Sequence, residues 1–246
     1  MRQSRAMPRN PMDLPELLAW VDDPQAIEHL RSYFEPGRAP GTMPRYSGSR
    51  FEFLAGGGDR CESANRITSD DLVAVTLLAV DVPGYVALQL FEGDLGPHVT
   101  GYLEQIPTDV SINDPEAAGL FAEASPARVA WDLLEKPHGM GWVITNKLLA
   151  RKRPRLIPVY DGVVQCAYGS PVGLWNWLVV LFAEDGGVLN DHLLVAREAA
   201  GVSSKVTALR VLDVIVWMRH RDDHRRNGCP GPSSGESLAD AGARSA

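Results

Sequence analysis

A pair of glycines inside an otherwise helical region constrains the fold more than any other feature of the chain. Gly139 and Gly141 are separated by one apolar residue in the run Lys136-Pro-His-Gly-Met-Gly-Trp142, and helix-like sequence flanks them on both sides. Glycine lets the backbone turn tightly where a side chain would obstruct it. The preceding helix begins at Ser125-Pro126, where a capping hydroxyl stands directly before a proline. The pattern predicts a helix-hairpin-helix at about residues 126–150.

The periodicity elsewhere predicts an all-α fold, with one short extended segment near residues 50–54. Thr68-Ser-Asp-Asp71 has a hydroxyl followed by acids, which is typical of a helix start. The apolar run after it would also suit a buried strand, but the cap favours a helix. We expect a disordered leader at residues 1–12, a single helical domain at 13–221 and a disordered tail at 222–246.

Positive charge is concentrated around the predicted hairpin although the chain as a whole is acidic, with a net charge of −7. An acidic protein does not coat nucleic acid non-specifically, so any such contact must be local. Residues 136–160 contain no Asp or Glu, and their basic residues are Lys136, Lys147, Arg151, Lys152, Arg153 and Arg155. This segment is therefore the predicted contact with phosphate.

The hairpin supplies a mechanism for that contact. Backbone N–H groups at a helix N-terminus lack partners and attract an anionic phosphate oxygen. Lys147 and Arg151 are four residues apart, so they share one face of the second helix. The predicted DNA-binding residues are Gly139, Met140, Gly141, Lys147, Arg151, Lys152 and Arg153. The alternative is a tight connection between two helices, followed by a solvated basic loop.

The segment from about Ser125 to Tyr168 resembles the helix-hairpin-helix DNA glycosylase superfamily. Asp161 follows Gly141 by 20 residues and stands at a predicted helix start, as that family's catalytic aspartate does. The resemblance implies that Asp161 is catalytic. A carboxylate beside a flipped nucleotide stabilises an oxocarbenium-like transition state or positions a water. Members with lyase activity carry a lysine two residues after the second glycine, where this chain has Val143, so the resemblance implies a monofunctional N-glycosylase.

A second resemblance covers the run from Gly139 to Asp161 together with Asn65-Arg-Ile-Thr-Ser-Asp-Asp-Leu72. Both segments are similar to an uncharacterised bacterial domain-of-unknown-function family, which carries no established activity. Trp142 and Tyr160 flank the motif and could line a base pocket by stacking, although large aromatic residues more often pack in a core.

Two alternatives to a glycosylase stay open. The first is a catalytically inactive helix-hairpin-helix module for DNA binding or interaction, in which Asp161 only caps a helix. The second is a helical partner-binding protein of unknown function that does not contact nucleic acid. The sequence also leaves the recognised base lesion and the oligomeric state open.

We expect no cofactor and no metal site. The three cysteines, at positions 61, 166 and 229, are too far apart for a C-x-x-C site and too few for the four-cysteine cluster of some glycosylases. His220 and His224 are one helical turn apart and could chelate a metal, but the favoured interpretation is a solvated helix end. The chain has neither an apolar run near the roughly 20 residues that span a bilayer nor a secretory signal, so we expect a cytoplasmic protein.

Overall fold

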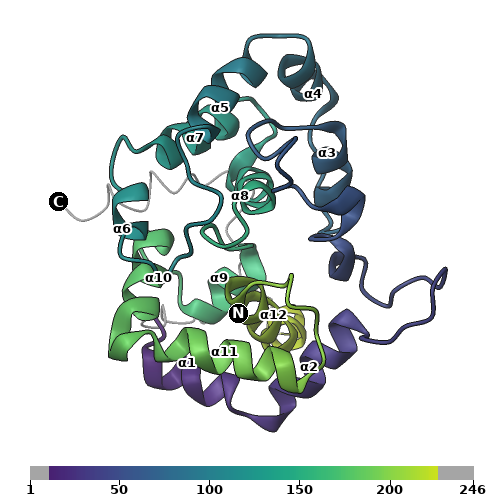
Figure 1. Cartoon of the computed structure of the whole chain (residues 1–246), viewed down its shortest axis with the longest axis vertical. Coiled ribbons are helices and arrows are strands. Elements are labelled where there is room, and N and C mark those ends of the chain that lie inside the picture. Colours follow the sequence, from purple (N-terminus) through teal and green to yellow (C-terminus); the bar gives the residue numbers. More distant parts are fainter. Residues whose placement is uncertain (1–10, 227–246) are drawn as a thin grey trace, which may run out of the picture.

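A computed structural model shows how the chain folds and describes residues 11–226 (Figure 1). All regular structure in this range is helical, which confirms the predicted all-α class. The α-helices are α1 (Leu14–Val21), α2 (Pro24–Phe34), α3 (Ser69–Thr76), α4 (Gly84–Phe91), α5 (Leu95–Leu103), α6 (Ala117–Leu120), α7 (Pro126–Glu135), α8 (Gly141–Lys152), α9 (Gly162–Tyr168), α10 (Leu174–Ala183), α11 (Val188–Ala199) and α12 (Ala208–Arg226). Three 3₁₀ turns are η1 (Ser47–Arg50), η2 (Leu54–Gly56) and η3 (Glu184–Gly186).

The prediction of an extended segment near residues 50–54 is wrong. These residues form consecutive tight turns instead, and the Phe53 N–H donates to the Arg50 carbonyl at 3.0 Å. Phe51 is buried at this point, so the segment contributes an aromatic side chain to the core.

Capping side chains begin several helices where the sequence predicts them. The Ser125 hydroxyl accepts from the Arg128 N–H at the start of α7, directly before Pro126. Thr68 and Asp71 form a reciprocal capping box at α3, in which the Thr68 N–H donates to the Asp71 carboxylate at 2.9 Å. These contacts satisfy N–H groups that have no partner within the helix.

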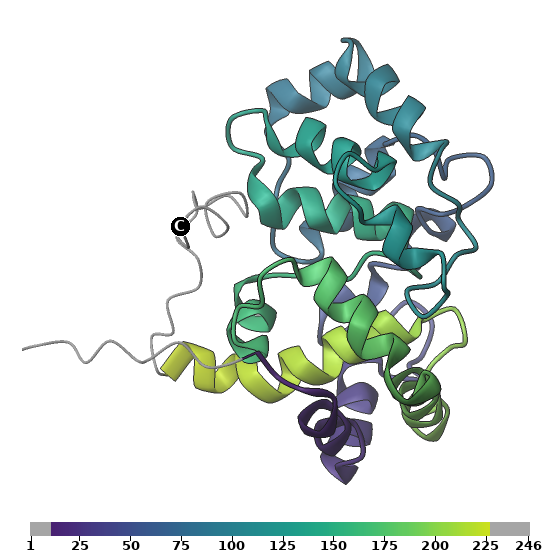
Figure 2. The same ribbon diagram turned by 90° about the vertical axis from the view of Figure 1, so that its left-hand side faces the viewer.

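The helices form two groups that share one hydrophobic core (Figures 1 and 2). The upper group in Figure 1 contains α3, α4, α5, α7 and α8, and the lower group contains α1, α2 and α9–α12. Helix α12 packs against α2, α9 and α11. Every residue of α12 from Leu209 to Val216 is buried, which identifies it as the central helix of the lower group.

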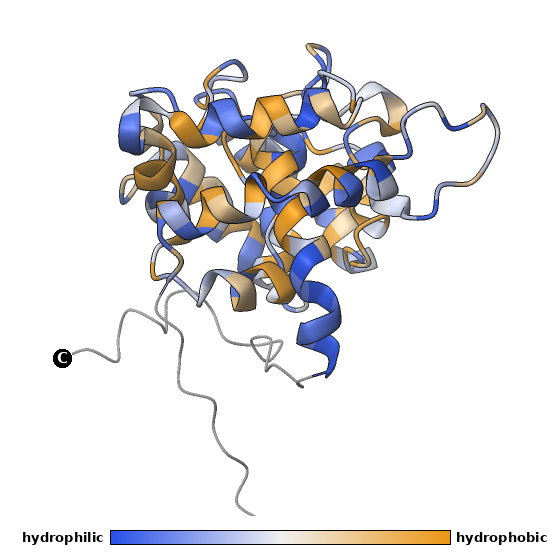
Figure 3. Ribbon diagram, turned by 90° about the horizontal axis from the view of Figure 1, so that it is seen from below, coloured by the Kyte–Doolittle hydropathy of each residue, from blue (hydrophilic) through white to orange (hydrophobic). Residues whose placement is uncertain are grey.

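Helix α12 is longer than the sequence predicts. It continues through Arg226, so the expectation that a disordered tail begins at residue 222 is wrong for 222–226. Its last turns are hydrophilic (Figure 3) and extend beyond the neighbouring helices (Figure 2). Met12, which falls within the predicted leader, is buried, and its N–H donates to the Tyr168 carbonyl at 3.1 Å. The rest of the predicted leader and tail, 1–10 and 227–246, lies outside the described residues.

Among residues 11–226, no helix combines the length and the apolar character that crossing a bilayer requires.

Candidate active site

The predicted hairpin joins α7 to α8. Gly139 and Gly141 have φ angles of +82° and +58°, a left-handed conformation that strains other residues. Both glycines and His138 are exposed, whereas the Met140 side chain is buried and anchors the turn. No side chain among residues 11–226 caps the start of α8, so no described residue satisfies its first N–H groups in that way. The structure thus contains an exposed helix N-terminus where the sequence predicts phosphate binding.

The four cations that the sequence assigns to DNA contact are not available for it. Lys147, Arg151, Lys152 and Arg153 are between 0 and 3% exposed. The prediction that they hold the phosphate backbone is therefore wrong. Lys147 and Arg151 share a face of α8 that turns inward, and Lys152 and Arg153 turn inward as well, because acceptors inside the protein satisfy all four charges.

Arg151, Lys152 and Arg153 form an internal cation cluster at the end of α8. Arg151 Nε lies 3.3 Å from Asp71 Oδ1, and Lys152 Nζ pairs with Asp71 Oδ2. Lys152 Nζ also donates to the carbonyls of Gly58 and Ser63, each at 3.0 Å. These bonds fasten α8 to α3 and to the irregular segment before it.

Arg153 forms no hydrogen bond with a carboxylate of the described part of the chain. Its guanidinium donates to the carbonyls of Ile106 and Ala64, each at 2.8 Å, and to Asn65 Oδ1 at 2.7 Å. Burial lowers the pKa of Arg153 to about 10. The side chain thus works as a structural donor that ties together three segments of the chain.

Asp161 is the N-cap of α9 and also faces a cavity. Its Oδ1 accepts from the N–H groups of Val163 and Val164 at 3.0 and 3.1 Å. Its Oδ2 lies 3.9 Å from Lys147 Nζ, which is beyond hydrogen-bond distance, and the side chain is 24% exposed. One carboxylate oxygen is therefore committed to the helix, and the other is directed toward Lys147.

The cavity beside Asp161 has a volume of about 320 Å³ and is lined by residues of both helix groups. Its walls come from α2, the segment 45–48, the residues after α3, and α8, α9 and α12. Tyr33 and Tyr46 stack with ring centroids 5.2 Å apart, and Trp217 meets Tyr46 edge-on at 6.1 Å. We call this space the Asp161 cavity. Its size is at the lower end of the roughly 300–1,000 Å³ typical of small-molecule pockets.

Charged groups lie beneath the aromatic wall. Arg210 pairs with Glu52 at 2.5 Å and donates to the Tyr33 hydroxyl at 2.9 Å. Burial raises the pKa of Asp213, whose Oδ2 accepts from the Val159 N–H at 2.8 Å. Burial lowers the pKa of Lys147, and the carboxylate of Asp161 opposes that shift. The cavity thus combines apolar walls with a few fixed polar groups, the composition of a ligand site.

The assignment of Trp142 and Tyr160 to a base pocket is wrong. They are 5% and 1% exposed, pack against each other with centroids 5.2 Å apart, and do not line the Asp161 cavity. The apolar run 156–159 enters the core and carries Tyr160 with it. The aromatic side chains that do line the cavity, Tyr33, Tyr46 and Trp217, were missed because they come from distant parts of the chain.

A larger cavity of about 440 Å³ lies elsewhere. Its lining includes Arg60, Arg155, Arg197 and Lys205, and Arg151 is its only contribution from the predicted site residues. This basic cavity carries no motif and contains neither Asp161 nor the hairpin glycines. We therefore take the Asp161 cavity as the candidate active site.

Comparison with known proteins supports one of the two resemblances seen in the sequence. No curated protein and no solved structure matches the chain. The resemblance of residues 65–72 and 139–161 to an uncharacterised family is confirmed, since one family model covers both segments. Because this model matches residues 26–220, the chain belongs to a family of unknown function (DUF6308).

Proposed function

We propose that this protein binds DNA through its hairpin and acts as a monofunctional N-glycosylase on a flipped base. The observation that carries the proposal is that the two carboxylate oxygens of Asp161 have different surroundings. Asp161 Oδ1 caps α9, while Oδ2 stands at the wall of a cavity of about 320 Å³. A carboxylate so fixed stabilises positive charge that develops on a sugar bound there, or orients an attacking water.

The Asp161 cavity supplies surfaces suited to a base. Tyr46 and Trp217 are half-buried, so each ring keeps some area for contact with a ligand. Stacking of a base on an aromatic ring contributes about 1–3 kcal/mol. Lys147 Nζ donates to the Leu78 carbonyl at 2.9 Å, which holds the ammonium beside Asp161. The polar groups that a flipped nucleotide would meet are thus held in position before it binds.

The hairpin and the Asp161 cavity are close enough for one short stretch of DNA to contact both. Lys147 is six residues beyond Gly141 on α8, which corresponds to about 9 Å along the helix axis. A phosphate on the hairpin amides and a nucleotide turned into the cavity would therefore belong to one short stretch of DNA. Because the cations of α8 are buried, exposed Lys136 and the backbone amides of the hairpin would supply the electrostatic attraction for phosphate.

A second candidate is a DNA-binding or interaction module without catalysis. The specific observation that favours it is that Asp161 makes both of its hydrogen bonds to the N–H groups of its own helix. A helix cap alone would explain that geometry. A helical protein that binds only other proteins is the third candidate.

Cleavage of a panel of damaged-base oligonucleotides by wild type and Asp161→Asn tests the proposal. Asparagine caps a helix about as well as aspartate, so the variant should fold while losing the charge. Asp13→Asn is a matched control, because Asp13 caps α1 in the same manner. We expect base removal by wild type and by Asp13→Asn, with a loss of about 100-fold or more in Asp161→Asn.

Other outcomes separate the alternatives. Equal activity in all three proteins, or activity in none, would remove the catalytic assignment. Binding of duplex DNA that weakens steeply with salt would then leave the inactive DNA-binding module. Absence of salt-sensitive binding would leave only the partner-binding protein.

A further inference from the structure

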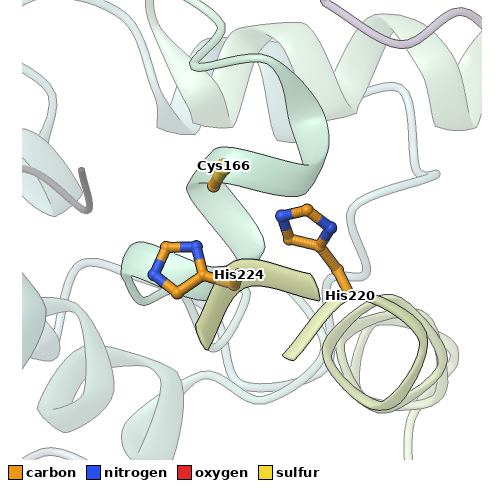
Figure 4. Close-up of side chains that lie close together, drawn as sticks. All are labelled: Cys166, His220 and His224. Atoms are coloured by element: carbon orange, nitrogen blue, oxygen red, sulfur yellow. The ribbon is translucent and has the colours of Figure 1, made fainter. Parts of the chain in front are cut away.

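Helices α9 and α12 bring together three side chains that are far apart in the sequence. Cys166 lies in the last turn of α9, and His220 and His224 lie one turn apart near the end of α12. Figure 4 shows the three side chains gathered where the two helices meet. Their potential ligand atoms, one sulfur and two ring nitrogens, all lie within 4.8 Å of one another. Extension of α12 through Arg226 places both histidines on a folded helix.

The geometry points to a zinc site formed by Cys166, His220 and His224. A thiolate and two imidazoles suit Zn²⁺, which binds sulfur at about 2.3 Å and nitrogen at about 2.0–2.1 Å. Tetrahedral coordination at these lengths sets ligand atoms roughly 3.5 Å apart. Ligand atoms that lie within 4.8 Å of one another need to approach by no more than about 1.3 Å to reach this spacing.

The surroundings of the cluster favour a ligand over a solvated helix end. All three residues are half-buried, so the cluster is partly screened from water yet open to an entering ion. His224 Nδ1 is buried and forms no hydrogen bond with another described residue. Burying a polar nitrogen without a hydrogen-bond partner costs free energy, because the nitrogen loses its contact with water. Coordination to a metal ion would give this nitrogen a partner and remove that cost. Three protein ligands leave a fourth position for water or another ligand.

A zinc ion here would fix α9 against α12. Helix α9 has Asp161 at its N-cap and Cys166 five residues later, so a metal bound at one end would restrain the carboxylate at the other. The inference does not depend on glycosylase activity, because it concerns binding and stability alone.

Metal titration of the untagged full chain tests the inference. The protein is first freed of metal with a chelator under reducing conditions, then titrated with Zn²⁺ in a calorimeter. We expect one Zn²⁺ per chain, release of protons from the thiol and imidazoles, and a melting temperature that rises with Zn²⁺ concentration. Absence of saturable binding would overturn the proposal.

Single substitutions locate the ion. Cys166→Ser and His224→Ala each remove a ligand, and Zn²⁺ affinity should fall by more than the roughly 10–100-fold that loss of an outer partner costs. Cys61→Ser and His98→Ala are matched controls, because both residues are exposed and lie outside the cluster. Binding that is unchanged in Cys166→Ser and His224→Ala, or lost equally in the controls, would overturn the assignment.

Cobalt provides a readout in the wild-type protein that does not depend on folding of the variants. Co²⁺ bound by Cys166 and the two histidines should show a thiolate-to-cobalt charge-transfer band together with the intense visible bands of four-coordinate Co²⁺. Zn²⁺ should displace it in a 1:1 ratio. A bound Co²⁺ without the thiolate band would place the ion elsewhere and contradict the site.

Discussion

Lys147 Nζ and Asp161 Oδ2 lie 3.9 Å apart, with Lys147 buried on α8 and Asp161 at the start of α9. Desolvation lowers the pKa of Lys147, and the charge of Asp161 is the largest influence that raises it. Lys147 lies between the hairpin glycines and Asp161 in the sequence. Their interaction connects the charge state of the Asp161 cavity to the packing of α8.

Replacing Asp161 with Asn should lower the pKa of Lys147 further, because the opposing negative charge is lost. A titration that follows the lysine Nζ or Cε resonances by NMR measures the change. Asp13→Asn is the control and should leave the Lys147 resonance unchanged, since Asp13 caps a different helix. A pKa of Lys147 that is the same in Asp161→Asn would show that the pair does not interact in solution.

The lowered pKa of Lys147 also predicts how the free energy of unfolding changes with pH. The pKa of Lys147 is lower in the folded state than in the unfolded state, where it is near 10.5. Between these two values the unfolded chain binds more protons, so the contribution of Lys147 to the free energy of unfolding rises with pH. Chemical denaturation over this window should therefore show a less positive pH slope in Lys147→Met than in wild type. Equal slopes would contradict the shift.

Asp71→Asn should be strongly destabilising. Asp71 is 1% exposed and is the carboxylate that faces both Arg151 and Lys152. Its removal leaves two buried cations without their paired carboxylate, and loss of one partner from such a site costs about 3–5 kcal/mol. Urea denaturation measures the effect.

Asp70→Asn is the matched control for that experiment. Asp70 precedes Asp71 in the same helical turn, but its pair with Arg60 is 3.5 Å long and the two side chains are 48% and 37% exposed. Exposed pairs contribute about 0–1 kcal/mol, so this change should have little effect. Similar losses in both variants would mean that the first-turn charge, rather than the cation cluster, sets the stability.

Lys136→Gln should reduce the salt dependence of DNA binding, whereas Lys147→Met should not. Lys136 is exposed beside the hairpin, and Lys147 is 3% exposed. Loss of one phosphate contact lowers the slope of log affinity against log salt by about 1. Lys205→Gln is the informative control, since Lys205 is exposed and lines the larger basic cavity. A slope that changes for Lys205→Gln alone would move the DNA contact to that cavity.

Gly48→Ala should obstruct the Asp161 cavity. An added Cβ would lie 2.2 Å from the Tyr33 hydroxyl and 2.8 Å from a Leu78 methyl group, so both of these lining residues must move. Overpacking of this kind costs about 1–3 kcal/mol and should weaken binding of a free base. Gly101→Ala, in α5 with open space around it, should instead stabilise by about 0.5–1 kcal/mol. Denaturation and ligand titration of both variants check the contrast.

Local signals were sufficient to predict much of the fold. Ser125-Pro126, Thr68 with Asp71, and Asp161 each begin a helix in the structure, because capping depends on residues within one turn. The hairpin glycines also have the backbone conformation that their spacing predicts. The end of α12 was predicted too early, since polar residues in a projecting helix resemble a tail when only composition is considered.

Local sequence signals could not predict whether the basic side chains of α8 point to solvent or to the core. Spacing correctly places Lys147 and Arg151 on one face of α8, but it does not indicate whether that face meets solvent or core. The acceptors that draw these side chains inward are Asp71 and backbone carbonyls in residues 51–78, all distant in sequence. Similarly, the walls of the Asp161 cavity come from four helices and three connecting segments, so no local pattern indicates them.

The internal cation cluster has a consequence for how the protein reaches its native state. Arg151 bonds to the Phe51 carbonyl across 100 residues of chain, and Lys152 and Arg153 reach partners 89 residues away. None of these bonds can form until distant segments have met, so the cluster contributes nothing to early, locally formed helices. The three charges should therefore leave water together late in folding, after the rate-limiting step, and substitutions at Asp71 should accelerate unfolding more than they retard refolding.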